Sequence, residues 1–245
     1  MSIESPNDLA GMKKVGRVVA DVLDTMRRAI KPGLTTRELD EIAARRLAFH
    51  GARSAPREAY QFPGYTCISV NEEIVHGIPG DRRIEAGDVV KIDVTAELDG
   101  YIADAARTVL VGDVTPIARR LRMSAIKALE SALSVARAGE RVGAIGRAVH
   151  AQATRDGFAV ARELAGHGVG RRIHEPPNVL NFDSGSREKL TDGLVIAIEP
   201  MLTALPARCV EESDGWTIRT HNWSLAVHEE HTVVITAGRP LVLTA

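Results

Sequence analysis

The sequence has few cysteines, no excess of charge of one sign and no long hydrophobic run. Two cysteines among 245 residues, Cys67 and Cys209, are too few for a disulfide framework or a structural zinc site. The 31 basic and 32 acidic residues give a formal net charge of -1, so the chain lacks the basic excess typical of proteins that bind nucleic acid or anionic lipid. These shortages favour a small or peptide-like partner over nucleic acid.

No part of the chain indicates insertion into a membrane or export. No stretch approaches about 18 uncharged apolar residues, and residues 1–6 lack the basic and apolar regions of a secretory signal. With 44% apolar and 26% charged residues, the composition is that of an ordinary globular protein, long enough for one large domain or two small ones. We therefore expect a cytoplasmic protein with no membrane partner.

Motifs of several common enzyme classes are also missing. No Gly-x-Ser-x-Gly elbow, phosphate-binding Walker loop or dinucleotide-binding glycine motif follows a predicted strand. Neither cysteine has a neighbouring helix start that would activate it as a nucleophile. Carboxylates and histidines are therefore the remaining candidates for the chemistry.

The spacing of apolar residues predicts the order of the secondary structure elements. Apolar side chains recur every three or four residues after Pro6, and Thr35 with Glu38 has the spacing of a capping box. Short apolar runs around Asp99 and Gly100 predict a hairpin of two strands. The expected helices cover residues 6–30, 35–49, 115–138 and 142–156, and the expected strands lie within 67–110, 194–202 and 217–236. The expected order is helices, strands, helices, strands.

That order suggests an internal repeat. Shifting the chain by 106 residues places residues 87–93 (GDVVKID) on 193–199 (GLVIAIE), so that a glycine, several β-branched residues and a final carboxylate coincide. A match of this length also arises by chance. If the repeat is real, Asp93 and Glu199 end equivalent strands, and a two-fold-like arrangement would bring them to one central site.

Three acidic residues lie where a strand is expected to be buried. With Asp99 and Gly100 as the turn, position 95 faces 104 and 93 faces 106, so Asp93 and Asp104 are diagonal neighbours on one face. Such positions lie roughly 7–8 Å apart, close enough to share a cation, although both side chains could equally lie on the solvated face of an exposed hairpin. Glu199 ends an apolar run and needs a metal or a cationic partner, with a buried arginine as the alternative to a metal.

Three histidines lie in segments rich in glycine or proline, which predict loops. His167 is flanked by glycines in the segment GHGVG, which indicates an imidazole held by a closely packed backbone. His174 follows seven residues later, ahead of prolines, and His76 lies in the segment VHGIP. A single loop histidine is more often a surface residue than a ligand. In the last polar cluster, HEEH, strand parity does not decide whether Glu229 or Glu230 points inward.

These motifs, in this order, resemble those of type I methionine aminopeptidases of the compact bacterial form, in peptidase family M24. The resemblance covers nearly the whole chain and includes the segments HGIP at 76–79, IDV at 92–94, GHGVG at 166–170, HEP at 174–176, IEPM at 198–201 and EHT at 230–232. It implies the pita-bread (creatinase/aminopeptidase) fold, an α+β architecture of two pseudo-symmetric halves around an antiparallel sheet with flanking helices.

The resemblance also implies a site for two divalent metal ions. The expected ligands are Asp93, Asp104, His167, Glu199 and Glu230, with Asp104 and Glu230 bridging the ions. Four carboxylates and one imidazole are ligands suited to Mn, Fe or Co, unlike the thiolates of a structural zinc site. Zinc is a further candidate for the bound metal. In the family's mechanism a metal-bound hydroxide attacks the first peptide carbonyl, while the metals polarise that carbonyl and hold the free amine. Glu199 matches the residue usually assigned as general base.

By the same resemblance, two of the loop histidines contact the substrate. His174 and His76 match residues that hydrogen-bond the substrate and the developing oxyanion. Cys67, Phe62 and Trp216 match positions that line an apolar pocket for the methionine side chain, although each could also be an ordinary core residue. The resemblance therefore predicts both a catalytic centre and a specificity pocket.

The implied activity is removal of the N-terminal (initiator) methionine from nascent proteins and peptides that have a small second residue. We expect a single catalytic domain, 1–245, with an internal repeat of roughly 6–113 and 114–245, acting as a monomer on nascent chains near the ribosome. No N-terminal zinc-binding extension is present, so any ribosome association would use the body of the domain.

Ile173 and Ala59 stand where aromatic residues are common in the family, which leaves the pocket's shape less defined than the chemistry.

Three other interpretations compete. Prolidases and aminopeptidase P share this fold and a similar ligand set, but they usually carry an additional N-terminal domain, for which a first helix near residue 6 leaves no room. A non-catalytic relative that binds peptides would be expected to lose ligands, whereas every expected ligand position holds a metal-capable side chain. A metal-free structural protein would have to match the family pattern by coincidence.

Overall fold

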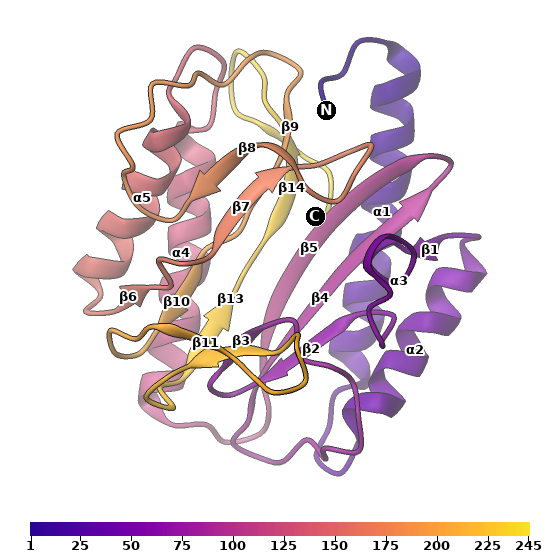
Figure 1. The fold of residues 1–245 in the computed structure, drawn as a ribbon, viewed down its shortest axis with the longest axis vertical. Helices are drawn as coiled ribbons and strands as arrows, with labels where there is room; N and C mark the ends of the chain where they lie inside the picture. Colours follow the sequence, from indigo (N-terminus) through magenta and orange to yellow (C-terminus); the bar gives the residue numbers. More distant parts are fainter.

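The computed structural model describes residues 1–245 as two halves, each with helices that cover one face of antiparallel strands (Figure 1). The first half contains α1 (Pro6–Ala29), α2 (Thr36–Phe49), β1 (Arg53–Ser54), α3 (Ala55–Tyr60), β2 (Cys67–Val70), β3 (Glu73–Val75), β4 (Val89–Leu98) and β5 (Tyr101–Leu110). The second half contains α4 (Pro116–Val135), α5 (Val142–Arg155), β6 (Ala159–Val160), β7 (Ala165–Gly168), β8 (Glu175–Leu180), β9 (Val195–Ile198), β10 (Met201–Thr203), β11 (Cys209–Glu211), β12 (Ile218–Thr220), β13 (Ala226–His228), β14 (His231–Val234) and β15 (Leu241–Val242). None of the helices combines the length and the apolar character that crossing a bilayer requires.

The four long helices form where the sequence predicts them, because each has an apolar stripe, and α1, α2 and α4 also begin with a side-chain cap. Ser5 accepts a hydrogen bond from the Asp8 amide at the start of α1, and Thr35 with Glu38 forms the predicted capping box of α2. One correction concerns α4, which ends at Val135 instead of residue 138 because the backbone leaves the helical conformation at the next residue.

Four sheets connect these elements. β4 is central in the first half and pairs with β1, β2 and β5, while the largest sheet of the second half has the order β15-β14-β9-β7-β8. Two three-stranded sheets have the orders β13-β10-β6 and β11-β12-β3, and the latter joins strands of both halves. One apolar core lies under α1 and α2, including Met12, Leu39 and Ile92, and a second lies under α4 and α5, including Leu121 and Ile145.

The offset of 106 residues seen in the sequence recurs in the elements. Added to the bounds of α2 (36–49) and β1 (53–54), it gives those of α5 (142–155) and β6 (159–160). Two isolated bridges repeat in the same way, Thr35 with Arg83 and Arg141 with Lys189. The two halves therefore follow one structural plan.

Two strands lie where the content of glycine and proline predicted loops. His167 lies in β7, and the residues that follow His174 form β8 in spite of their prolines. A Cβ atom at Gly166 would lie 2.5 Å from the carbonyl oxygen of Ala197, so only glycine allows this approach of β7 to β9. The glycines that weaken the local strand signal are the residues that allow the tertiary pairing.

The two halves meet along a central seam, formed by residues 104–108 of β5 and residues 228–232 at the junction of β13 and β14. In its middle, the Glu230 amide donates to the Ala106 carbonyl at 3.0 Å. At one end, the Thr232 hydroxyl accepts from the Asp104 amide at 2.9 Å and donates to the Asp104 carbonyl at 2.7 Å. A side chain thus takes the place of a backbone partner and fixes Asp104 against the second half.

The other end of the central seam repeats this arrangement with the roles of the halves exchanged. The Thr108 hydroxyl accepts from the His228 amide at 3.0 Å and donates to the His228 carbonyl at 2.8 Å. Arg107 donates to the carbonyl of Glu230 at 2.6 Å on the same seam. Both halves therefore hold the backbone of residues 228–232 in place.

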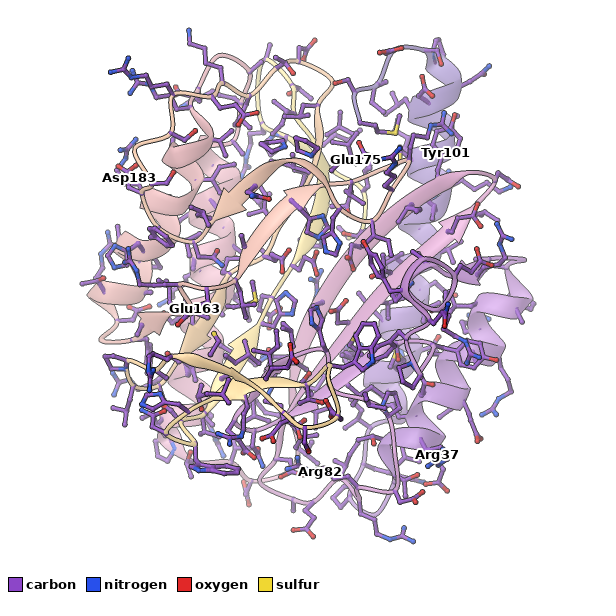
Figure 2. All side chains as sticks on the ribbon, viewed as in Figure 1. Arg37, Arg82, Tyr101, Glu163, Glu175 and Asp183 are labelled. Carbon is purple, nitrogen blue, oxygen red and sulfur yellow. The ribbon has the colours of Figure 1, made fainter.

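A second junction anchors the segment between β7 and β8. Arg171 donates to Asp8 at 2.9 Å, and its guanidinium lies 3.8 Å from the ring centre of Tyr101, whose hydroxyl also donates to Asp8 at 3.0 Å. Glu175 accepts the Arg171 amide at 2.8 Å and forms an ion pair with the amine of Met1. Figure 2 shows Glu175 and Tyr101 close to the N-terminal part of the chain. These contacts fix the segment that carries the second predicted loop histidine.

Candidate active site

A cavity of about 350 Å³ lies between the two halves. It contains all of the residues that the sequence and its resemblance suggested: Asp93, Asp104, His167, Glu199, Glu230, His76, His174, Cys67, Phe62 and Trp216. The carboxylates come from both halves, and no lysine or arginine lines the cavity. The cavity therefore concentrates carboxyl groups without a lysine or arginine to balance them.

The hairpin of β4 and β5 positions the two aspartates. Its turn residues Asp99 and Gly100 both have positive φ, 54° and 81°, as a two-residue hairpin turn with matching twist requires. The register pairs Thr95 with Asp104 and Asp93 with Ala106, as predicted. Asp93 and Asp104 therefore share one face, and that face borders the cavity instead of bulk solvent.

The second half contributes three residues from three different strands or strand ends. His167 lies in β7, Glu199 directly follows β9, and Glu230 lies between β13 and β14. The Nδ1 atom of His167 lies 2.9 Å from the carbonyl oxygen of Gly168, so Nδ1 carries the proton and Nε2 is free to bind a metal. The parity left open by the sequence is settled, since Glu230 lines the cavity whereas Glu229 faces Arg122 on α4.

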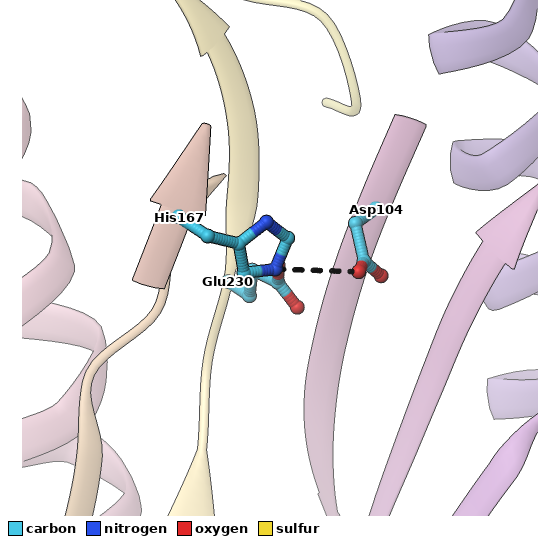
Figure 3. A group of neighbouring side chains, drawn as sticks. All are labelled: Asp104, His167 and Glu230. Carbon is cyan, nitrogen blue, oxygen red and sulfur yellow. Dashed lines mark ion pairs between the residues drawn. The ribbon is translucent and has the colours of Figure 1, made fainter. Parts of the chain in front are cut away.

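Two groups of side chains have the spacing of metal ligands. The first is Asp104, His167 and Glu230 (Figure 3), and the second is Glu199, His228 and Glu230; within each, one ligand atom per residue lies within 4.8 Å of the others. The Nε2 atom of His167 lies 3.9 Å from Asp104 and 3.5 Å from Glu199. Because the groups share Glu230, they form one continuous site.

Ionised carboxylates are costly at this site, because they are buried and no lysine or arginine lines the cavity. Burial raises the pKa of Glu199 to about 8, although His167 opposes the shift. Burial, together with neighbouring carboxylates, raises the pKa of Asp93 and of Glu230 well above the usual range. One oxygen of Asp93 and one of Glu230 are buried without a hydrogen-bond partner. A divalent cation would neutralise the carboxylates and satisfy these atoms, so the residues fit a metal site.

The alternatives to a metal are not found in the structure. Glu199 lies near His167 and His228 and forms no ion pair with an arginine, which removes the buried salt bridge that the sequence left open. Burial lowers the pKa of His228 to about 4, so its imidazole is neutral at pH 7 and cannot balance the carboxylates. The donor set therefore contains no lysine or arginine that would balance the carboxyl groups.

His174 and His76 border the same cavity from two loops. The Tyr60 hydroxyl lies 2.8 Å from Nδ1 of His174, and the two rings stack with centres 5.8 Å apart. Burial lowers the pKa of His174 to about 4, and nearby His167 adds to the shift. Burial also lowers the pKa of His76, whose backbone has a positive φ of 60°. Both imidazoles are therefore neutral, each with one proton to donate.

The apolar part of the cavity lies beside the carboxylates. Phe62 meets Trp216 edge to face with ring centres 5.1 Å apart, and Cys67 has a buried thiol whose pKa burial raises well above the usual range. Ile173 lines this part as well. Ala59 is exposed and does not line the cavity, and an aromatic ring at the cavity comes from the next residue, Tyr60.

The cavity residues that were not predicted from the sequence include His228 and Tyr60. His228 had a signal, since it lies two positions before Glu230, and residues two apart share a face of an extended chain. Tyr60 had no such signal in the sequence, because α3 has only six residues and its direction depends on how it packs.

Comparison with known proteins gives a consistent result over the whole chain. The model of metallopeptidase family M24 matches residues 10–237. A Bacillus subtilis (strain 168) protein named methionine aminopeptidase 2 is 42% identical over 247 residues, covering 100% of this chain and 99% of that protein. A methionine aminopeptidase of Aquifex aeolicus is 41% identical, covering 100% of this chain and 99% of that protein.

Solved structures agree in fold. The methionine aminopeptidase from Rickettsia prowazekii superimposes with a TM-score of 0.96 at 34% identity, and each chain is covered to 100%. The prolidase from Pyrococcus furiosus has a TM-score of 0.80 at 24% identity, and the match covers 99% of this chain but 65% of that chain, so it shows the shared fold alone. The predicted α+β pita-bread fold with two pseudo-symmetric halves is confirmed.

Proposed function

The chain belongs to metallopeptidase family M24, and from this premise we infer that it removes the N-terminal methionine from polypeptides in a metal-dependent reaction. The observation that carries this conclusion is the full-length match to proteins named methionine aminopeptidase, at 42% identity. The cavity agrees with it, because buried acids and imidazoles lie beside an apolar pocket.

We propose that the site holds two divalent ions. Asp93, Asp104, His167, Glu199 and Glu230 would be ligands, with Asp104 and Glu230 shared between the ions. The overlap of the two ligand groups at Glu230 supports a pair of adjacent ions. The excess of carboxylates over imidazoles favours Mn, Fe or Co, with zinc as a further candidate. When bound, the ions lower the pKa of water and polarise the scissile carbonyl.

The side chains around the site would move protons and hold the substrate. Glu199, as general base, would accept a proton from the attacking water. His174 and His76 would donate hydrogen bonds to the substrate and to the oxygen that gains charge. The Tyr60 hydroxyl contacts Nδ1 of His174, so a Tyr60 that donates there leaves the other ring nitrogen as a proton donor.

The apolar part of the cavity would select the substrate. Cys67, Phe62 and Trp216 would surround an unbranched methionine side chain, and the bound ions would hold the free amine of the substrate. The substrates would be nascent chains with a small second residue, met in the cytoplasm near the ribosome by a monomeric enzyme. A restricted space beyond the first peptide bond is the expected reason for the small second residue.

The test is release of methionine from the peptide Met-Ala-Ser by protein stripped with a chelator. Added Mn(II) or Co(II) should restore release, and Glu199→Ala should abolish it while the control Glu188→Gln, an exposed glutamate outside the cavity, should not. Met-Leu-Ser tests the second residue, and Ala-Pro tests prolidase activity. No release from folded protein with any divalent metal would overturn the proposal and favour a peptide-binding relative.

A further inference from the structure

His228 is a buried cavity residue with a fixed backbone. It is the last residue of β13, it is 1% exposed, and it borders the cavity on the face it shares with Glu230. Both its amide and its carbonyl are bound by the hydroxyl of Thr108 across the central seam, at 3.0 and 2.8 Å. The fold therefore fixes the backbone that carries this imidazole at the cavity.

Neither nitrogen of the His228 ring has a hydrogen-bond partner. A buried polar group without a partner is costly, so a second component is expected at this position. His231, three residues further on, is different: its ring nitrogens meet Arg107 and Thr244, at 2.8 Å each. His228 is therefore available to a ligand, whereas His231 is part of the surrounding structure.

The distances around the His228 ring have the spacing of shared metal ligands. Its Nε2 atom lies 3.4 Å from a carboxylate oxygen of Glu199 and 3.6 Å from one of Glu230. These separations exceed the roughly 2.7–3.2 Å of a hydrogen bond. Two atoms that each lie about 2.1 Å from one ion at a tetrahedral angle are about 3.4 Å apart, which agrees with both distances.

We propose that His228 is an additional metal ligand, which binds through Nε2 to an ion that Glu199 and Glu230 also hold. The inference rests on the proposed metal site and goes beyond its expected set of ligands, which has a single imidazole. A site with two imidazoles binds intermediate metals such as Fe, Co and Zn more strongly, relative to Mn, than an oxygen-rich site does. His228 would thus help to decide which metal the protein takes up.

The experiment counts the imidazoles bound to Co(II). In the proton NMR spectrum of the Co(II)-loaded protein, each ligated histidine gives a strongly shifted ring N–H signal. We expect two such signals in the native sequence, one in His228→Gln, and two in His174→Gln, the control for a cavity histidine outside the ligand groups. Calorimetric titration with Co(II) should also show about 10- to 100-fold weaker binding of one ion to His228→Gln.

The outcomes separate this inference from the proposed function. One shifted signal in the native sequence, or two in His228→Gln, would overturn the role of His228 while leaving the metal site intact. No bound Co(II) at all would overturn the metal site and this inference with it. The count in the native sequence needs no variant, so the test stands even if His228→Gln does not fold.

Discussion

At the residue scale, the contact between Tyr60 and His174 makes a specific prediction. Tyr60→Phe removes the hydroxyl 2.8 Å from Nδ1 of His174 but keeps the stacked ring. The imidazole then loses the partner that selects its tautomer, so kcat/KM for Met-Ala-Ser should fall about 5-fold, the effect of about 1 kcal/mol. Steady-state kinetics on the metal-loaded enzyme checks this.

Tyr65→Phe is the matched control for that measurement. Tyr65 packs under Arg57 and does not line the cavity, so loss of its hydroxyl should leave kcat/KM unchanged. An unchanged kcat/KM in Tyr60→Phe would show that His174 keeps its orientation without the tyrosine.

The positions of individual site residues were predictable to different degrees. Asp93 and Asp104 could be placed together from the hairpin turn, because a two-residue turn fixes the register of the strands. Glu199 was identified by its place at the end of an apolar run. The sequence could not show that the His228 ring lacks hydrogen-bond partners, because this depends on which side chains the tertiary structure places around it.

At the element scale, the central seam links the position of Asp104 to the second half. Thr232→Val removes the hydroxyl that binds both the amide and the carbonyl of Asp104. Asp104 should then shift relative to Glu230, and the affinity for Co(II) should fall about 10-fold, as for other loss of support around metal ligands. Calorimetric titration measures this affinity.

The control is another buried threonine in the same half. Thr203→Val loses a hydroxyl that donates to the Leu205 carbonyl within its own segment, at 2.8 Å. Both variants should unfold at a lower temperature, but only Thr232→Val should bind the metal more weakly. Equal metal affinities would show that the threonine supports the fold and not the site.

The helices were predictable from the sequence, whereas β7 and β8 were not. Apolar periodicity and caps are local, so α1 and α2 could be read directly. The strands that carry His167 and follow His174 contain glycine or proline, which disfavour strands when taken alone. Their pairing depends on close approach to β9. This is a tertiary contact that local sequence patterns do not predict.

At the scale of the whole molecule, the metal-free site should make stability depend on pH. Burial raises the pKa of Glu199 from 4.5 to about 8, and those of Asp93 and Glu230 well above their usual values, so the folded state binds more protons than the unfolded state. Their contribution is fully present at low pH and is lost as the pH rises through the folded pKa values.

Two kinds of group act in the opposite direction. His174 and His228 have pKa values lowered from 6.5 to about 4, so they reduce stability only below pH 6.5. The pKa of Lys91 is lowered to about 7, and above that pH it offsets one of the three carboxylates. Between pH 6.5 and 8 the carboxylates therefore dominate.

The free energy of unfolding of the metal-free protein should accordingly fall by on the order of 4 kcal/mol from pH 6.5 to pH 8. Urea titrations at several pH values measure it. With saturating Mn(II) the fall should disappear, because the bound ions keep the carboxylates ionised and bind only the folded state. A metal-free protein that gains stability over this range would contradict the assignment of raised pKa values.

The arrangement of the halves supports a single functional unit. We propose that residues 1–245 form one catalytic domain with an internal repeat of roughly 6–113 and 114–245, because neither half holds all of the proposed ligands. The first half supplies Asp93 and Asp104, and the second supplies His167, Glu199 and Glu230.

The connection between the halves has a practical consequence. The chain passes from β5 to α4 through a short loop in which Gly112 and Asp113 are exposed, while the central seam and the sheet of β11, β12 and β3 hold the halves together without covalent bonds. Two fragments produced separately and divided at Asp113 would therefore be candidates for reassembly by complementation. Divalent metal would strengthen their association, so the extent to which the two fragments associate would report the concentration of available metal.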